Sequence, residues 1–286
     1  MLNLQRCSAL KRVKIRILLN LPYYISKRLK ANENTFSSTV HTIATVSICV
    51  GLAVMLISVM ILGGFTSTIE NKIYSFSGHL QVVKFTLNNA IEESPFSKEN
   101  ALINSPEAFN GITHIQEYSH KATLLKSEHE IQGVLLKGVS TSFDTANFNQ
   151  NIVEGRFVMF SDSAYSREVL LSRKMGRLMR VGVGDQVTLN FMDFASKPPS
   201  LRTRRLMVTG LYETGLEDFD DHIILGDIGL IRRLNNWADS LVGGYEVFVD
   251  DASNIGAVER QLYDNLEYDL YPQKVSDKYI QFFDWM

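Results

Sequence analysis

Apolar residues are concentrated in one stretch near the amino terminus. Residues 34–69 contain no Asp, Glu, Lys or Arg, and only three hydroxyl side chains interrupt the apolar run 43–62. A helix of about 20 residues rises about 30 Å, the thickness of the hydrocarbon core of a bilayer. The run begins too far into the chain for a signal peptide and has no small-residue cleavage site. The pattern predicts an uncleaved transmembrane helix over residues 40–65.

The segments on both sides of this span also have helical patterns. Leu21, Ile25 and Leu29 recur every four residues among basic residues, which predicts an amphipathic helix at the membrane interface. A disordered basic tail is the alternative. After the span, we expect the helix to extend over 66–79, with an apolar stripe and a stop at Gly78.

The rest of the chain alternates between strand-like and helix-like patterns. Short apolar runs with a period of two predict strands, and a period near four predicts helices between them, so we expect an α+β region with open sheets. The last three elements are expected to form a β-α-β unit. Strands are predicted at 80–85, 113–126, 131–139, 168–171, 187–192, 205–212, 223–225, 245–249 and 268–275, and helices at 172–180, 227–237 and 252–266.

The charge distribution predicts the orientation of the chain. Residues 1–33 hold eight basic residues and one acidic residue, a net charge of +7. Residues 70–286 hold 21 basic and 30 acidic residues, a net charge of −9. Lys and Arg beside a span stay in the cytoplasm, so we expect a cytoplasmic amino terminus and residues 66–286 outside. The acidic exterior argues against a nucleic-acid partner.

Candidate catalytic and metal-binding patterns are weak. The region after the span contains no cysteine, and the spacing of His114 and His120 fits no metal site. The glycine-rich stretch 182–185 is not followed by the G-K-[ST] of a phosphate-binding loop, so we interpret it as a β-turn. The carboxylates at 217–221 do not have the spacing of an EF-hand, and a solvated turn is the favoured interpretation over a calcium site. We expect no enzymatic activity, no metal and no cofactor.

Several weak motifs occur in a recognisable order. The span ends in Gly63-Gly64-Phe65, followed by Ile69-Glu70-Asn71-Lys72-Ile73 and Gly78-His79-Leu80. Further motifs are Ile152-Val153-Glu154-Gly155-Arg156, Glu168-Val169-Leu170-Leu171-Ser172, Val183-Gly184-Asp185-Gln186-Val187, Val208-Thr209-Gly210-Leu211-Tyr212-Glu213-Thr214-Gly215, Phe219-Asp220 and Phe282-Phe283-Asp284-Trp285-Met286. In this order they resemble the MacB/FtsX-like permeases of type VII ABC transporters, most of all the lipoprotein-releasing LolC/LolE branch.

The resemblance implies a fold and a division of the chain. It implies an exterior, periplasmic MacB-like domain over 80–275, between the first and second spans of a bacterial inner-membrane subunit. That domain has a porter-like α/β part at 80–140 and 211–275 and an inserted, β-rich Sabre part at 141–210. Residues 276–286 correspond to the approach to a second span, and the chain stops where we expect that span to begin.

The resemblance also implies a function and its partners. We expect the permease of a mechanotransmitting ABC system, in which a separate ATPase subunit binds ATP and a second permease copy or a sister permease completes the membrane part. A lipoprotein cargo, membrane lipids and a periplasmic carrier are the other implied partners. An FtsX-like regulator of a cell-wall hydrolase and a self-contained single-span sensor or adhesin are the alternatives.

Two sets of site residues follow from these expectations. Phe65 and Ile69, at the outer end of the span, are expected to face the lipid chains of the cargo, although the neighbouring glycines fit simple helix packing equally well. The stretch 193–203 is expected to be an exposed loop. In LolC-like subunits a loop at this place contacts the carrier, and a passive surface loop is the alternative. The candidate contact residues are Lys197, Pro198, Pro199, Arg202 and Arg204.

Overall fold

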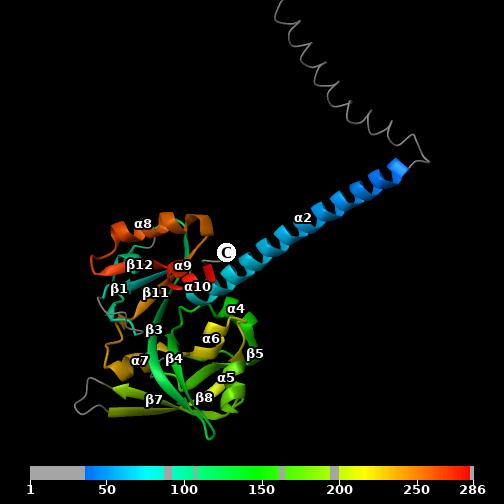
Figure 1. The fold of residues 1–286 in the computed structure, drawn as a ribbon. Helices are drawn as coiled ribbons and strands as arrows, with labels where there is room; N and C mark the ends of the chain where they lie inside the picture. The colour runs from blue at the N-terminus through cyan, green and yellow to red at the C-terminus, as the bar shows by residue number, and fades with distance from the viewer. Residues whose placement is uncertain (1–35, 87–91, 106–107, 161–164, 194–199, 284–286) are drawn as a thin grey trace, which may run out of the picture. The chain divides into compact units, whose positions relative to one another are not determined.

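A computed structural model describes most of the chain (Figure 1). The chain divides into two units, Met1–Ser67 and Thr68–Met286. The predicted interfacial helix at residues 20–30 lies outside the described residues. The described residues are 36–86, 92–105, 108–160, 165–193 and 200–283.

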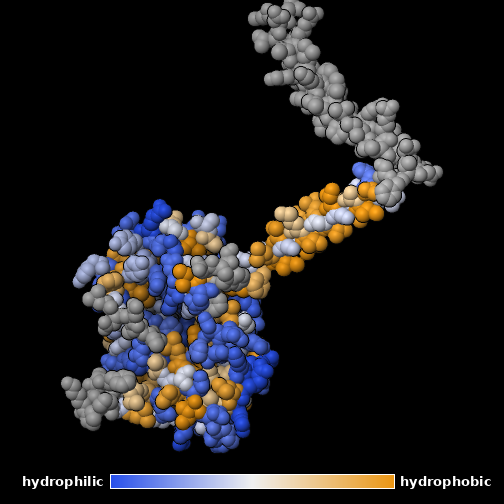
Figure 2. Space-filling view, in the orientation of Figure 1, coloured by the Kyte–Doolittle hydropathy of each residue, from blue (hydrophilic) through white to orange (hydrophobic). Residues whose placement is uncertain are grey.

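Helix α2, Phe36–Ser77, contains the predicted transmembrane segment. In the described part of the chain it is the one helix long and apolar enough to cross a membrane. Its large apolar side chains within the first unit are exposed, as the orange surface in Figure 2 shows. The hydroxyls of Thr45, Ser47 and Ser58 donate to the carbonyl oxygens four residues earlier, at 2.8–2.9 Å. These bonds satisfy the three polar side chains within the apolar surface.

The carboxyl end of α2 belongs to the second unit and packs into its core. Ile73 and Phe76 are fully or almost fully buried there, which confirms the predicted apolar stripe. Gly78 ends the helix with a φ of +71°, and its N–H donates to the carbonyl of Tyr74 at 2.8 Å. A left-handed residue at this position favours glycine, so the predicted stop is also confirmed.

A mixed sheet forms the body of the second unit (Figure 1). Strands from both predicted parts, porter-like and Sabre-like, pair within it, and their division remains a prediction. A further strand, β7 (Gln186–Asp193), pairs with both β3 and β8. The order along the sheet is β12 (Leu270–Lys274), β1 (Leu80–Lys84), β11 (Gly244–Val249), β3 (Ile112–Lys126), β4 (Ile131–Val139), β9 (Ile223–Asp227), β6 (Glu168–Ser172), β8 (Ser200–Tyr212) and β5 (Ile152–Gly155). A separate pair consists of β2 (Phe96–Ser97) and β10 (Leu241–Val242).

The predicted β-α-β unit is present, but another strand lies inside it. Strands β11 and β12 flank β1, and each pairs with β1 in antiparallel register. They are therefore parallel to each other, with helix α8 (Ile255–Asn265) connecting them. The strand that follows the membrane helix thus pairs with the last two strands of the chain.

The boundaries of the predicted loop at 193–203 are wrong. Strand β7 pairs with β8 along the whole length of β7, from Gln186↔Met207 to Asp193↔Ser200. On β8, Thr203 and Arg205 are exposed while Leu206 is buried, which is the pattern of a sheet with one solvated face. Residues 194–199, which connect the two strands, lie outside the described residues.

Some helices of the second unit start at capping side chains. Ser172 accepts a hydrogen bond from the N–H of Met175 at 2.9 Å, and Asp227 accepts one from the N–H of Gly229 at 2.7 Å. The predicted turn at 217–221 is instead a short helix. The helices are α3 (Ala101–Asn104), α4 (Thr145–Phe148), α5 (Arg173–Met179), α6 (Glu217–His222), α7 (Ile228–Asn235), α8, α9 (Val275–Lys278) and α10 (Ile280–Phe283), with 3-10 turns η2 (Asn149–Asn151) and η3 (Ala252–Asn254).

Three apolar clusters fill the second unit. One contains residues of α5 and α7 against β4, β6, β7 and β8. The second is rich in aromatic rings and contains the end of α2 with α4, α6 and α9. The third contains α3 and α8 against β1 and β11. The membrane helix therefore ends inside the aromatic cluster, which positions the start of the sheet.

Helix α7 lies directly on strand β4 at Gly138, which gives a first testable expectation. A Cβ at Gly138 would lie 2.8 Å from the Cα of Ile228, a backbone atom that cannot rotate away. We expect Gly138→Ala to lower the free energy of unfolding by about 1–3 kcal/mol through overpacking. Gly133→Ala on the same strand is the matched control, because nothing lies within 4 Å of its added Cβ. Denaturant unfolding in detergent measures both, and equal effects would contradict the close contact.

Candidate functional site

The two residues expected to face lipid chains lie one turn apart on α2 and differ in exposure. Phe65 lies in the first unit and its side chain is 54% exposed. Ile69 lies in the second unit and packs partly buried against the aromatic cluster. Their roles at the membrane remain predictions.

Two of the predicted carrier-contact residues lie on strand β8 rather than in a loop. Arg202 is partly buried, and its Nη1 donates to the carbonyl of Leu234 in α7 at 2.8 Å. The Arg204 guanidinium donates to the carbonyl of its own neighbour Thr203, at 2.9 Å. Residues Lys197, Pro198 and Pro199 lie outside the described residues. Arg202 therefore connects a helix to the sheet, and Arg204 is the better candidate for an external contact.

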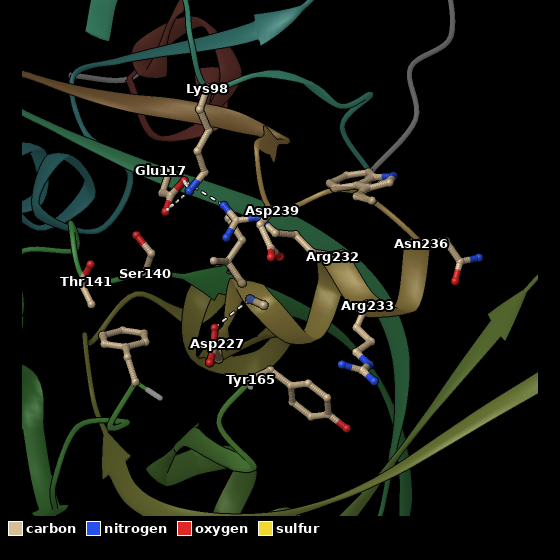
Figure 3. A pocket seen from close by; sticks show the side chains of 14 residues that line it. Lys98, Glu117, Ser140, Thr141, Tyr165, Asp227, Arg232, Arg233, Asn236 and Asp239 are labelled. Carbon is tan, nitrogen blue, oxygen red and sulfur yellow. Dashed lines mark hydrogen bonds and ion pairs between the residues drawn. The ribbon is translucent and has the colours of Figure 1, made fainter. Parts of the chain in front are cut away.

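A polar cavity of about 620 Å³ lies beside α7 (Figure 3). Lys98, Glu117 and Arg232 meet on one side of it, and Tyr165 and Arg233 lie on another. No sequence motif indicated this cavity, because its lining comes from separate segments of the chain. The other lining residues are Ser140, Thr141, Phe160, Asp227, Ile228, Gly229, Asn236, Trp237 and Asp239.

Two cations share one carboxylate on this side of the cavity. Lys98 Nζ and Arg232 Nη2 approach the same oxygen of Glu117, at 2.7 and 2.8 Å. Burial of Glu117 opposes its ionised form, but the hydrogen bond from Lys98 and the charge of Arg232 outweigh it and lower the pKa of the carboxyl. Burial, and then the charge of Glu117, raises the pKa of the neighbouring Tyr245 to about 12. The three charged groups thus form a satisfied cluster that fixes α7 to β3.

Other polar groups of the lining are a buried carboxylate and two hydroxyls. The carboxylate of Asp227 accepts hydrogen bonds from the N–H groups of Ser166 and Gly229 at 2.6 and 2.7 Å. The hydroxyl of Ser140 is hydrogen-bonded to the side chain of Glu117, which links it to the charged cluster. Among the residues that line the cavity, no histidine accompanies the hydroxyls of Ser140 and Thr141.

The sequence candidates for metal binding have structural partners. His120 Nδ1 lies 2.6 Å from Glu93, whose carboxylate also accepts from the His120 N–H at 2.8 Å. Burial opposes the ionised form of Glu93, but its interactions with His120 lower the pKa of the carboxyl. Asp220, within the acidic stretch, is buried and accepts from Thr214 and Gly215 at 2.9–3.1 Å. Among the described residues, no three His, Cys, Asp or Glu side chains are grouped to hold a metal ion.

Sequence reasoning missed the most deeply buried charges. Lys137 on β4 and Glu246 on β11 form an ion pair at 2.7 Å, and their side chains are 1% and 0% exposed. Gln116 Nε2 donates to the other oxygen of Glu246 at 2.7 Å. Lys137 also donates to the carbonyl of Phe76 at the end of α2. A lone Lys inside a predicted strand gives no sign of such a partner, because the partner is far away in the sequence.

Comparisons with known proteins identify related chains. The family model of the MacB-like periplasmic core domain matches residues 40–264. The lipoprotein-releasing system transmembrane protein LolC of Buchnera aphidicola subsp. Schizaphis graminum is 20% identical over 76% of this chain and 52% of its own length. LolC of Xylella fastidiosa is 21% identical, and the match covers 71% of this chain and 47% of the length of that LolC. The chain thus spans about half the length of the curated relatives it matches. The periplasmic region of MacB from Actinobacillus actinomycetemcomitans has a TM-score of 0.44 at 11% identity, over 72% of this chain and 92% of that chain.

The Glu117 cluster predicts a pH-dependent stability. A carboxyl whose pKa is lowered by folding adds stability above its ordinary pKa, and this stability is lost as the pH falls through the folded-state value. We expect Glu117→Gln to lower the free energy of unfolding by about 1–3 kcal/mol at neutral pH. The difference from the unmodified chain should shrink as the pH falls below the ordinary carboxyl pKa of 4.5 and then through the lower pKa of Glu117 in the folded chain. Denaturant titrations at several pH values, monitored by tryptophan fluorescence, measure the difference in the free energy of unfolding.

Glu213→Gln is the control for this expectation. Glu213 pairs with Arg173 at 3.1 Å, but both side chains are more than 40% exposed. Exposed ion pairs contribute about 0–1 kcal/mol, so this variant should differ little from the unmodified chain. A constant difference for Glu117→Gln from neutral to acid pH would contradict the assignment.

Proposed function

The chain belongs to the MacB-like periplasmic core domain family, and we propose that it is the amino-terminal part of an ABC transporter permease that releases lipoproteins. The similarity to two LolC proteins is the observation that carries this proposal. It favours lipoprotein release over cell-wall regulation or sensing. The route of α2 fits the proposal, since a single helix contains the apolar segment and ends in the core of the second unit.

The permease acts with several partners under this proposal. A separate ATPase subunit binds and hydrolyses ATP in the cytoplasm, and this chain contributes no catalytic group and no cofactor site. A second permease copy or a sister permease completes the membrane part. The cargo is a lipoprotein in the inner membrane, which is passed to a periplasmic carrier. Force generated by the ATPase reaches the second unit through α2.

The membrane orientation follows from the charge of the two ends. The strongly basic residues 1–33 remain in the cytoplasm, and the acidic second unit lies in the periplasm. Phe65, exposed in the first unit, contacts the lipid chains of the cargo or the surrounding bilayer. Ile69 packs partly buried against the aromatic cluster, so only the exposed part of its side chain contacts lipid.

The connection between β7 and β8 is the proposed carrier contact. Lys197, Pro198, Pro199 and Arg204 form this contact, and the positive charges match an acidic rim on the carrier. Arg202 is not a suitable target for testing it, because its contact with Leu234 makes it part of the fold. A charge change at that residue would disturb the attachment of α7.

Reporter fusions test the orientation. We expect a reporter fused after Lys30 to be active in the cytoplasm and one fused after Asp250 to be active only outside. The reason is the excess of basic residues before the span and of acidic residues after it. Activity of the second fusion in the cytoplasm would reject the proposed topology.

Affinity purification from the native host tests the function. We expect an ABC ATPase, lipoproteins and a periplasmic carrier to be recovered with the protein. Arg204→Glu combined with Pro198→Gly and Pro199→Ser should reduce carrier recovery about tenfold, since favourable charge pairs at interfaces contribute of the order of 1–2 kcal/mol. ATPase recovery should not change. Arg177→Glu is the matched control, because Arg177 is exposed and belongs to α5 rather than to β7 or β8. Recovery of the ATPase without any lipoprotein would reject lipoprotein release as the function.

A further inference from the structure

The carboxyl end of α2 and helix α9 attach to the same polar cluster, whose side chains on the sheet are buried and whose lysine on α9 is exposed. We call this cluster the charged junction and define it by Gln81, Gln116, Lys137, Glu246 and Lys278. Its residues come from β1, β3, β4, β11 and α9. In Figure 1, α9 and α10 lie beside the end of α2, and the rings of Tyr74 and Phe283 are 5.8 Å apart.

Lys137 attaches the end of α2 to the centre of the sheet. Its ammonium group donates to the carbonyl of Phe76, lies 4.6 Å from the centre of the Phe76 ring and pairs with Glu246. The last carbonyls of a helix have no partner within the helix, and the helix dipole makes this end negative. A buried cation at this place therefore stabilises one position of the last turn of α2 relative to the sheet.

Lys278 attaches α9 to the same cluster. Its Nζ donates to Gln81 Oε1 at 2.8 Å, while the amide of Gln81 donates to Glu246 and to the carbonyl of Ser77, each at 3.4 Å. The backbone adds a further contact, since the N–H of Val275 donates to the carbonyl of His79 at 3.1 Å.

The chemistry of the cluster favours a positioning role over a purely stabilising one. Well-packed apolar side chains often stabilise a core at least as much as a buried ion pair of similar volume. A set of directional hydrogen bonds instead specifies one arrangement of the groups it connects. The charged junction connects one segment that leads from the membrane helix with another that leads towards the predicted approach to a second span.

We infer that the charged junction is a positioning device that makes the carboxyl end of α2 and helix α9 move together with the sheet. This inference rests on the proposed transport function, in which movement of membrane segments must reach the second unit. Lys137 and Lys278 are positioning residues in this account, because they act through the segments they hold.

Hydrogen exchange of the full chain in detergent tests the inference. We expect Lys278→Met to accelerate exchange about tenfold both at 275–280 and at 76–81, because it removes a charged hydrogen bond to the buried Gln81. Exchange in β7 and β8 should not change. Lys174→Met is the matched control, since Lys174 pairs with Asp221 at the surface and should alter neither segment. Acceleration at 275–280 alone, or equal acceleration throughout the second unit, would overturn the inference.

A charge exchange separates the ion pair from the contact with α2. In Lys137→Glu combined with Glu246→Lys, opposite charges still face each other, but the carboxylate introduced on β4 cannot donate to the carbonyl of Phe76. We expect faster exchange in the last turn of α2 and near-normal exchange in β7 and β8. Normal exchange in that turn would overturn the role of Lys137. If the double variant does not fold, the exchange pattern of Lys278→Met alone decides whether the inference holds.

The exchange measurement needs no partner protein. A chain that purifies without an ATPase or lipoproteins but shows the expected exchange pattern would reject the proposed function and leave the mechanical connection in place. A chain that purifies with an ATPase and lipoproteins but lacks the expected exchange pattern would support the proposed function and overturn the role of the charged junction.

Discussion

Lys137 and Glu246 lie on strands β4 and β11, with β3 between them. In the register of the sheet, Glu246 pairs with Gln116 and Lys137 pairs with His120. Removing one partner of a buried ion pair costs about 3–5 kcal/mol, because the other charge stays buried without compensation. A shift of either strand by one residue would turn its charge to the opposite face of the sheet. The pair therefore selects the register of three neighbouring strands and, through Phe76, the position of the last turn of α2 within the second unit.

Other charged residues and one glycine of the second unit fix helices and a turn near the sheet that holds Lys137 and Glu246. Glu117 fixes α7 to β3 through Arg232, while Gly138 lets the same helix approach β4. Asp220 closes the turn that leads into α6. Each contact holds a helix to the sheet at one defined place, so the polar interior specifies geometry while the three apolar clusters provide most of the stabilisation.

Local patterns were sufficient to predict most elements, and long-range pairing was not. The span and the stop at Gly78 each depend on residues that are consecutive in the chain, and both were predictable. The position of β1 between β11 and β12 depends on pairing between distant segments, which periodicity does not encode. The cavity beside α7 and the Lys137–Glu246 pair share this property. Strand β8 was predicted too short because its solvent-facing Arg and Thr residues resemble a loop.

The pairing of β1 with β12 has a consequence for biosynthesis. Leu80 pairs with Lys274, 194 positions later in the chain. At a synthesis rate of roughly 5–20 residues per second, β1 waits roughly 10–40 s for this partner strand. During that time the apolar helix has already left the ribosome, and the first strand behind it has unpaired edges on both sides. The open edges of an unfinished sheet invite pairing with other chains. Protection of the nascent segment after α2 is thus a requirement for making this protein in a crowded cell.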